Sequence, residues 1–221
     1  MRIRVLIGLL VGVAAVACAQ SGASAPLPSD IDSQSYSRLP PVKRADLDPD
    51  GQRIYDMLAA PNKTVAPTGP AAISMYSPKV AESIQMLNQY LRFHGVLGRR
   101  DTEVAILVAA REFDQQYEWS GHEQAARASG VDETVIDAIK YGKDVAGLSD
   151  KDALIIRFGR QLLRQHKLSS DLFAQAVTAF GKQGTFEMSA VMGDYAMAAI
   201  MLSAADQRTP PDRKELPLPP K

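Results

Sequence analysis

Cysteine and histidine are scarce in this sequence. Its 221 residues include one cysteine, Cys18, and three histidines. A single cysteine excludes an intramolecular disulfide, a CxxC redox pair and a cysteine-rich zinc site. The histidines are far apart along the chain and form no H-x-x-x-H or H-E-x-x-H motif. We therefore expect no metal site.

Net charge is also lacking, because 25 basic residues balance 25 acidic ones. No block of lysine and arginine provides the clustered cations that nucleic acid or an anionic membrane surface would require. Apolar residues make up 46% of the chain, which is ample for a packed core. The composition predicts a globular protein that acts on small molecules or other proteins, with no nucleic-acid partner.

The apolar run near the start of the chain, from Val5 to Val16, is too short for a comfortable transmembrane helix. The run follows Arg2 and Arg4, and it ends at small residues around Cys18. This pattern predicts a signal peptide over residues 1–19 and a periplasmic location. Cleavage after Ala19 would remove the only thiol. The alternative is a lipoprotein anchored through Cys18, although Ala15 stands where such signals usually carry leucine.

Two proline-rich segments flank the rest. Residues 20–45 are rich in Ser, Pro and Ala and predict a flexible linker, while residues 206–221 predict an extended tail. Between them lies a single expected domain, residues 46–205. Removing the signal peptide leaves 23 basic against 25 acidic residues, a net charge of −2.

The domain is expected to be all-α. Cap residues, proline at first helical positions, apolar residues at helical spacing and terminating glycines mark the expected helices. No window shows the strict alternation of a strand. We expect a loop over 61–72 and helices near 49–60, from Pro78 to Gly95, from Asp101 onward, up to about Ser129, and over 132–142, 150–166, 170–180 and 185–204.

Three side chains are candidates for acid–base chemistry. Glu118 and His122 are four residues apart, so on a helix they share one face. A carboxylate beside an imidazole favours the charged ring and suits a proton-transfer group. Glu103 begins the preceding apolar helix, and its distance from His122 depends on a connection that the sequence does not fix. The alternative interpretation is a surface ion pair and an acid that complements its helix dipole.

The phrase around these residues resembles the carboxymuconolactone decarboxylase family, which includes an alkylhydroperoxidase D branch. Tyr117-Glu118-Trp119-Ser120-Gly121-His122 follows a helix led by Glu103 and precedes a helix end at Gly130-Val131. The stretches 90–97, 180–181 and 193–195 are also similar. The resemblance implies a compact all-α fold, trimeric or hexameric assembly, and sites near subunit contacts.

Within that family, the alkylhydroperoxidase branch uses a Cys-x-x-Cys-x-x-x-His motif. Alignment on His122 puts Gln115 and Glu118 at the two cysteine positions. Neither side chain can attack a peroxide and then form a disulfide, so peroxidase or peroxiredoxin activity is disfavoured. The decarboxylase branch keeps Glu-x-x-x-His, which matches Glu118 and His122.

The resemblance therefore implies a cofactor-free lyase or isomerase that acts on a small carboxylated lactone or enol. We expect His122, Glu103 and Glu118 to be catalytic, and the substrate to be held by residues drawn from Arg100, Arg111, Tyr195 and His94. His94 has a simpler interpretation as a residue favoured at a helix C-terminus. The other functional class left open is a binding or scaffold protein without turnover.

Overall fold

The computed structural model describes residues 27–59 and 65–217. Within these ranges every regular element is a helix, and the only β-type pairing is an isolated bridge between Asp32 and Ser37. The predicted all-α class is therefore confirmed. The signal region with Cys18 lies outside the described residues.

The described chain forms one short 3-10 helix and eight α-helices. They are η1 (Arg44–Asp46), α1 (Pro49–Leu58), α2 (Gly69–Ser74), α3 (Pro78–Phe93), α4 (Arg99–Glu112), α5 (Gln116–Ala128), α6 (Glu133–Lys140), α7 (Asp150–Gln165) and α8 (Ser170–Ala204). Most follow the predicted ranges, but α2 begins inside the segment 61–72 that was expected to be a loop.

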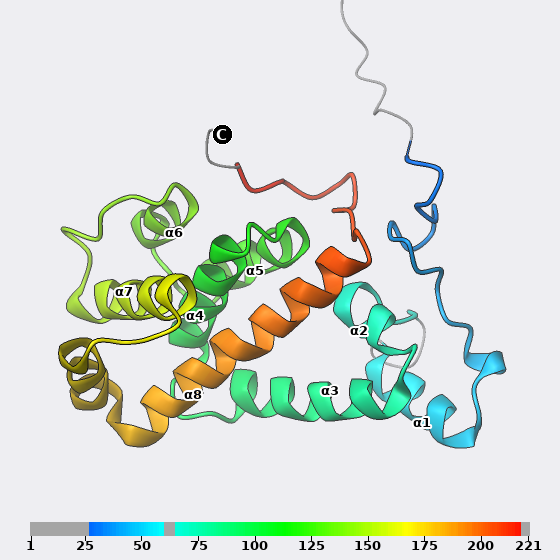
Figure 1. Ribbon diagram of the computed structural model, residues 1–221, viewed down its shortest axis with the longest axis horizontal. Coiled ribbons are helices and arrows are strands. Elements are labelled where there is room, and N and C mark those ends of the chain that lie inside the picture. Colours follow the sequence, from blue (N-terminus) through cyan, green and yellow to red (C-terminus); the bar gives the residue numbers. More distant parts are fainter. Residues whose placement is uncertain (1–26, 60–64, 218–221) are drawn as a thin grey trace, which may run out of the picture.

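Helix α8 combines the two helices expected on either side of Gly181. That glycine has φ 69° and ψ 173°, a backbone conformation that other residues rarely adopt. The chain bends there, and the long second half of α8 crosses the molecule (Figure 1). The α4–α7 group lies towards one end of α8 and α1–α2 towards the other, while α3 packs against α8 at an angle (Figure 1).

Helix α4 is the centre of the core. Every residue from Asp101 to Ala110 is buried, as the apolar run predicted, and α5, α6, α7 and α8 all pack on it. A separate small cluster of Ile54, Met75 and Ala81 joins α1, α2 and α3. Between these two packed regions, helices α3, α5 and α8 leave room for a pocket.

The segments on either side of the expected domain make defined contacts, with the domain and with each other. Arg38 donates a backbone hydrogen bond to the carbonyl of Ala205, and Arg208 donates one to Tyr36, each at 2.7 Å. Ile31 is only 7% exposed. These contacts use backbone pairing and isolated apolar side chains, which leave no periodic signal in the sequence.

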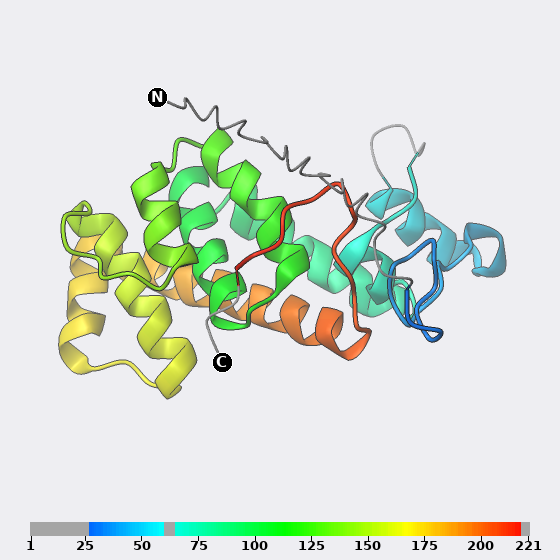
Figure 2. The same cartoon turned by 90° about the horizontal axis from the view of Figure 1, so that it is seen from above.

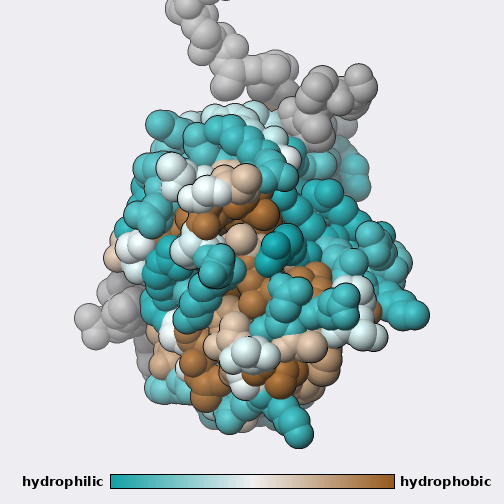
Figure 3. Space-filling model, turned by 90° about the vertical axis from the view of Figure 1, so that its left-hand side faces the viewer, coloured by the Kyte–Doolittle hydropathy of each residue, from teal (hydrophilic) through white to brown (hydrophobic). Residues whose placement is uncertain are grey.

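Some apolar side chains stay on the surface. Val80 and Leu87, which belong to the apolar stripe of α3, are 48% and 42% exposed. The end of the molecule formed by α6, α7 and the start of α8 also shows apolar patches among charged side chains (Figure 3). No helix in the described ranges is both long and apolar enough to cross a membrane. Assembly into trimers or hexamers stays a prediction.

Candidate active site

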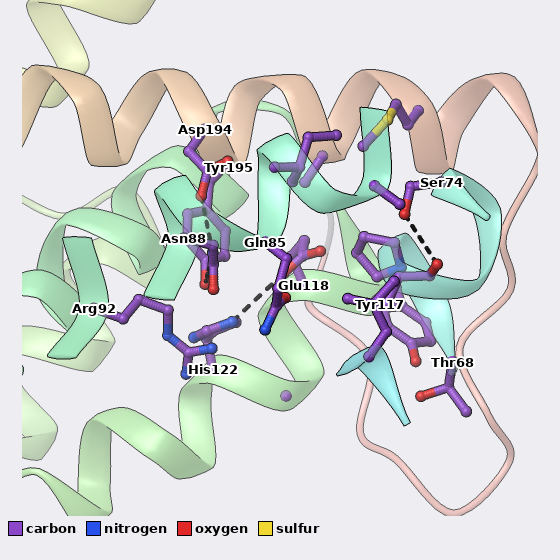
Figure 4. A pocket seen from close by; sticks show the side chains of 18 of the residues that line it. Thr68, Ser74, Gln85, Asn88, Arg92, Tyr117, Glu118, His122, Asp194 and Tyr195 are labelled. Atoms are coloured by element: carbon purple, nitrogen blue, oxygen red, sulfur yellow. Dashed lines mark hydrogen bonds and ion pairs between the residues drawn. The ribbon is translucent and has the colours of Figure 1, made fainter. Parts of the chain in front are cut away.

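A pocket of about 400 Å³ opens between α2, α3, α5, α8 and the C-terminal segment. Its polar lining comes mainly from three helices: Gln85, Asn88 and Arg92 of α3, Tyr117, Glu118 and His122 of α5, and Asp194 and Tyr195 of α8. These side chains point toward a shared space (Figure 4). A volume of this size accommodates a small organic ligand.

His122 lies between two glutamates. Its Nδ1 atom is 2.7 Å from Oε2 of Glu103, and its Nε2 atom is 3.6 Å from Oε2 of Glu118. The i, i+4 spacing on α5 places Glu118 and His122 on one helix face, as the sequence predicted. Glu103 reaches the ring from α4, which packs against α5. The three predicted catalytic residues therefore converge.

Glu103 is completely buried behind His122. Burial alone would raise its pKa, but the hydrogen bond with His122 and the charges of Arg92 and Arg99 outweigh burial and lower it. Arg99 Nη2 lies 3.0 Å from Oε1 of Glu103. An ionised carboxylate only accepts hydrogen bonds, so Nδ1 of His122 carries the hydrogen and the site directs Nε2 away from Glu103.

Glu118 has the opposite electrostatic environment. It is 5% exposed, and its Oε1 atom is buried without a hydrogen-bond partner among the described residues. Burial raises the pKa of Glu118 above its usual value despite the nearby charges of His122 and Arg92. The environment therefore favours the protonated form of Glu118 more than water does, and its Oε2 atom faces Nε2 of His122.

Asp194 and Tyr195 form a polar wall beside His122. The Tyr195 ring meets the imidazole edge-on, with centroids 4.9 Å apart. Asn88 donates to Asp194 Oδ2 at 2.8 Å. Burial raises the pKa of both Asp194 and Tyr195, so the wall favours uncharged side chains.

The close packing around Tyr117 depends on one glycine. Gly69 has φ 56°, and a Cβ atom there would lie 2.3 Å from the Tyr117 ring. Only glycine allows the start of α2 to approach the ring so closely. Tyr117 can thus line the pocket, whereas its neighbour Trp119 is fully buried and donates its indole N–H to Glu123.

Three residues expected to bind substrate lie outside this pocket. Arg100 binds Asp152 through both terminal nitrogens, at 2.7 and 3.0 Å. Arg111 donates to the carbonyl of Lys140 and pairs with Asp114. His94 caps the C-terminus of α3 and is exposed. Of the four predicted substrate-binding residues, only Tyr195 lines the pocket. Arg100 and Arg111 instead bind other residues of the protein.

Sequence reasoning missed several pocket residues. Gln85, Asn88 and Arg92 occupy positions i, i+3 and i+7 of α3, a polar stripe at helical spacing that could have been recognised. Arg92 Nη2 lies 3.5 Å from Oε1 of Glu103, and its buried Nε atom has no partner in the described structure. Arg213 also lines the pocket, from a segment without helical signal.

Comparison with solved structures identifies the architecture. A protein described as the alkylhydroperoxidase AhpD core, an uncharacterized peroxidase-related protein from Ralstonia eutropha, matches with a TM-score of 0.62 and 18% identity, over 86% of this chain and 95% of that one. The debrominase Bmp8 in its apo form matches with a TM-score of 0.59 and 14% identity, over 77% and 91%. The chain has the alkylhydroperoxidase D-like fold.

A third match with this fold contains a ligand. It is a Bmp8 variant with cysteine replaced by alanine, bound to 2,3,4-tribromopyrrole, with 12% identity and a TM-score of 0.59 over 77% of this chain and 90% of that one. No family model and no curated protein sequence matches the chain. The matches to solved structures confirm the resemblance seen in the sequence at the level of the fold.

Gln115 and Glu118, which align with the two cysteines of the alkylhydroperoxidase motif, have different surroundings in this structure. Gln115 is buried at the start of α5, where it accepts from the N–H of Tyr117 and donates to the Ser203 hydroxyl at 3.1 Å. It holds α5 to α8 and does not line the pocket. Glu118 does, so an acid takes the place next to His122. No group of three or more metal-ligating side chains occurs within the described ranges.

Proposed function

We propose that the protein is a cofactor-free acid–base enzyme, a lyase or isomerase that acts on a small carboxylated lactone or enol in the His122 pocket. The supporting observation is that one imidazole lies 2.7 Å from a fully buried glutamate whose pKa is lowered and faces, at 3.6 Å, a second glutamate whose pKa is raised by burial and whose Oε1 has no partner in the described structure. Such a pair of carboxyl groups with separated pKa values is typical of acid–base sites.

Each group has a defined role in this proposal. Glu103 fixes the ring and its tautomer, and Glu118 with Nε2 of His122 holds the transferable proton. In a decarboxylation, the bond to the carboxyl carbon breaks and carbon dioxide leaves. The electron pair enters the conjugated lactone as an enolate, which then takes the proton at carbon. Arg92 lies beside His122 (Figure 4) and supplies positive charge for the enolate oxygen.

The test is a turnover assay on purified mature protein with carboxymuconolactone and related lactone acids, following carbon dioxide release and loss of ultraviolet absorbance. We expect His122→Gln to lower kcat by about 10²- to 10⁴-fold while the helical circular dichroism spectrum stays unchanged. A variant with wild-type turnover would contradict the assignment. The matched control is His166→Gln, an exposed histidine that ends α7.

Peroxide reduction is the alternative chemistry suggested by the branch of the fold that uses thiols. With Gln115 and Glu118 at the thiol positions, we expect no thiol-dependent reduction of cumene hydroperoxide. Robust reduction would overturn the proposal, and binding of lactone acids without turnover would instead indicate a scaffold or binding protein.

We also propose that the protein is exported to the periplasm. The support is the pattern of Arg2, Arg4, an apolar run and small residues before Gln20. Mass spectrometry of the protein from its native host distinguishes the two processing routes, because signal peptidase cleavage leaves Gln20 first and lipoprotein processing leaves an acylated Cys18.

A further inference from the structure

The C-terminal strap, which we define as residues 207–217, crosses α5 (Figure 2), and its Arg213 lines the pocket. Leu216 is 2% exposed and belongs to the main core cluster. Its N–H donates to Oε1 of Gln116 at 2.5 Å, and Nε2 of Gln116 donates to its carbonyl at 3.0 Å. These contacts dock the strap at a defined position on α5.

Docking of the strap brings Arg213 into the pocket wall. The N–H of Arg213 donates to the carbonyl of Pro210 at 3.0 Å, which makes a turn in the strap. Its guanidinium carbon lies 4.9 Å from the centroid of the Tyr117 ring. Gly121 leaves space opposite, because a Cβ there would still be 3.8 Å from Nη1 of Arg213. The guanidinium of Arg213 is thus stacked on the Tyr117 ring, oriented by the turn in the strap and not crowded by Gly121.

Charge balance distinguishes Arg213 from the other pocket arginine. Arg92 lies within 3.5 Å of the ionised Glu103. In the described parts of the chain no carboxylate lies within ion-pair distance of Arg213. Burial raises the pKa of the remaining pocket acids, Glu118 and Asp194, although the charge of Arg213 acts to lower that of Glu118. Arg213 is therefore a pocket cation without an ion-pair partner in the described structure.

We propose that Arg213 binds the carboxylate of the ligand, so that the strap is the wall of the pocket that selects anionic substrates. A guanidinium stacked on an aromatic ring presents a planar set of donors that matches a carboxylate bidentately. This inference rests on the proposed function, because it takes the ligand to be a small lactone acid. It assigns recognition to Arg213 and leaves proton transfer to His122.

The experiment compares binding of muconolactone and its uncharged methyl ester by isothermal titration calorimetry. We expect the wild-type protein to prefer the acid, and Arg213→Gln to weaken acid binding about 10- to 100-fold without changing ester binding, because a hydrogen bond to a charged group is lost. Arg213→Lys should restore part of the preference. Arg208→Gln is the matched control, since Arg208 lies on the same strap, is exposed and pairs with Asp206.

Gln116→Ala tests the docking of the strap. It should reduce the ratio of acid to ester affinity, though less than Arg213→Gln, because Arg213 is retained but less well positioned. Acid binding that is unchanged in Arg213→Gln would overturn the inference. If His122→Gln still abolishes turnover in that case, the proposed function survives, whereas a wild-type protein that binds neither compound and turns over no lactone acid contradicts both.

Discussion

Two groups of charged side chains meet near the first turn of α4, and they use their hydrogen bonds differently. The α4–α7 ion cluster consists of Arg100, Asp101, Lys151 and Asp152. Both oxygens of Asp152 are bonded, to the two terminal nitrogens of Arg100 and to the hydroxyl of Ser149. The pocket cluster consists of Arg92, Glu103, Glu118 and His122. It leaves Nε of Arg92 and Oε1 of Glu118 unbonded in the described structure.

The difference separates stability from function. In the ion cluster, buried polar atoms find partners within the protein, so the cluster stabilises the junction of α4 and α7. In the pocket cluster, some hydrogen-bonding atoms have no protein partner and are available to a ligand. An unsatisfied buried group of this kind lowers the stability of the folded state. Residue type does not reveal this difference, because both clusters contain arginine and carboxylates.

The largest effect is expected for Glu103→Gln in the pocket cluster. The amide cannot ionise and does not enforce the Nδ1–H tautomer of His122, so kcat should fall by at least about 10²-fold. Steady-state turnover of lactone acids measures the loss. The same assay on Asp152→Asn should give a near wild-type kcat per folded molecule, and an equal loss in both variants would remove the functional distinction between the clusters.

Asp152→Ala should destabilise the fold through the ion cluster. The side chain of Asp152 is 4% exposed and that of Arg100 is 32% exposed, so breaking the pair should cost about 2 to 3 kcal/mol, below the range for fully buried pairs. Urea denaturation followed by circular dichroism measures this change. A loss below about 0.5 kcal/mol would show that the pair behaves as a surface salt bridge.

Stability should depend on pH with opposite signs for Asp152 of the ion cluster and Glu118 of the pocket cluster. Burial raises the pKa of Asp152, but the hydrogen bonds from Arg100 and Ser149 outweigh burial, so its pKa is lowered from the ordinary 3.8. Its contribution is therefore present above pH 3.8 and is lost as the pH falls through the lowered value. Glu118 has a pKa raised from 4.5, so it lowers stability progressively as the pH rises above 4.5.

These signs are tested with Asp152→Asn and Glu118→Gln in thermal melts from pH 3 to pH 8. Asp152→Asn should lower Tm at neutral pH and approach the wild type in acid. Glu118→Gln should raise Tm at neutral pH, and the gain should vanish below pH 4.5. A lower Tm for Glu118→Gln at pH 7 would contradict the assigned environment of Glu118.

The last comparison concerns two glycines, one in the core and one at the pocket, and Gly121→Ala should give the smallest effect of all. A Cβ at Gly159 would meet Val108 Cγ1 at 2.5 Å, so Gly159→Ala should destabilise by about 1 to 3 kcal/mol. A Cβ at Gly121 of α5 would meet only Nη1 of Arg213, at an ordinary contact distance of 3.8 Å, so Gly121→Ala should stabilise the helix by about 0.5 to 1 kcal/mol. Parallel urea denaturation compares them, and equal effects would show that the pocket face of α5 is as tightly packed as the core.

The sequence was sufficient to predict the helices because their signals are local. Asp48 caps α1 and Ser149 caps α7 as expected, and Gly181 interrupts α8 where two helices were predicted to meet. The short α2 was missed, since a six-residue helix containing glycine and proline resembles a loop. The fold class followed from periodicity, whereas the packing of helices did not.

The site was predictable only in part. The i, i+4 relation of Glu118 and His122 is a property of one helix, but the approach of Glu103 depends on how α4 packs on α5. The arginines were harder to assign. Arg100 and Arg111 were chosen for their place in the motif, yet their partners are Asp152 and the carbonyl of Lys140, which come from other helices. Arg213 reaches the pocket through the strap, whose docking depends on single contacts.

The central claim is that His122, held by Glu103, transfers a proton to or from carbon in the pocket. It is tested most directly by incubating muconolactone-type acids with the protein in D₂O and following deuterium incorporation at carbon by ¹H NMR. The account predicts enzyme-dependent incorporation that is lost in His122→Gln and retained in the His166→Gln control. Incorporation at the same rate in His122→Gln and the wild type would contradict it.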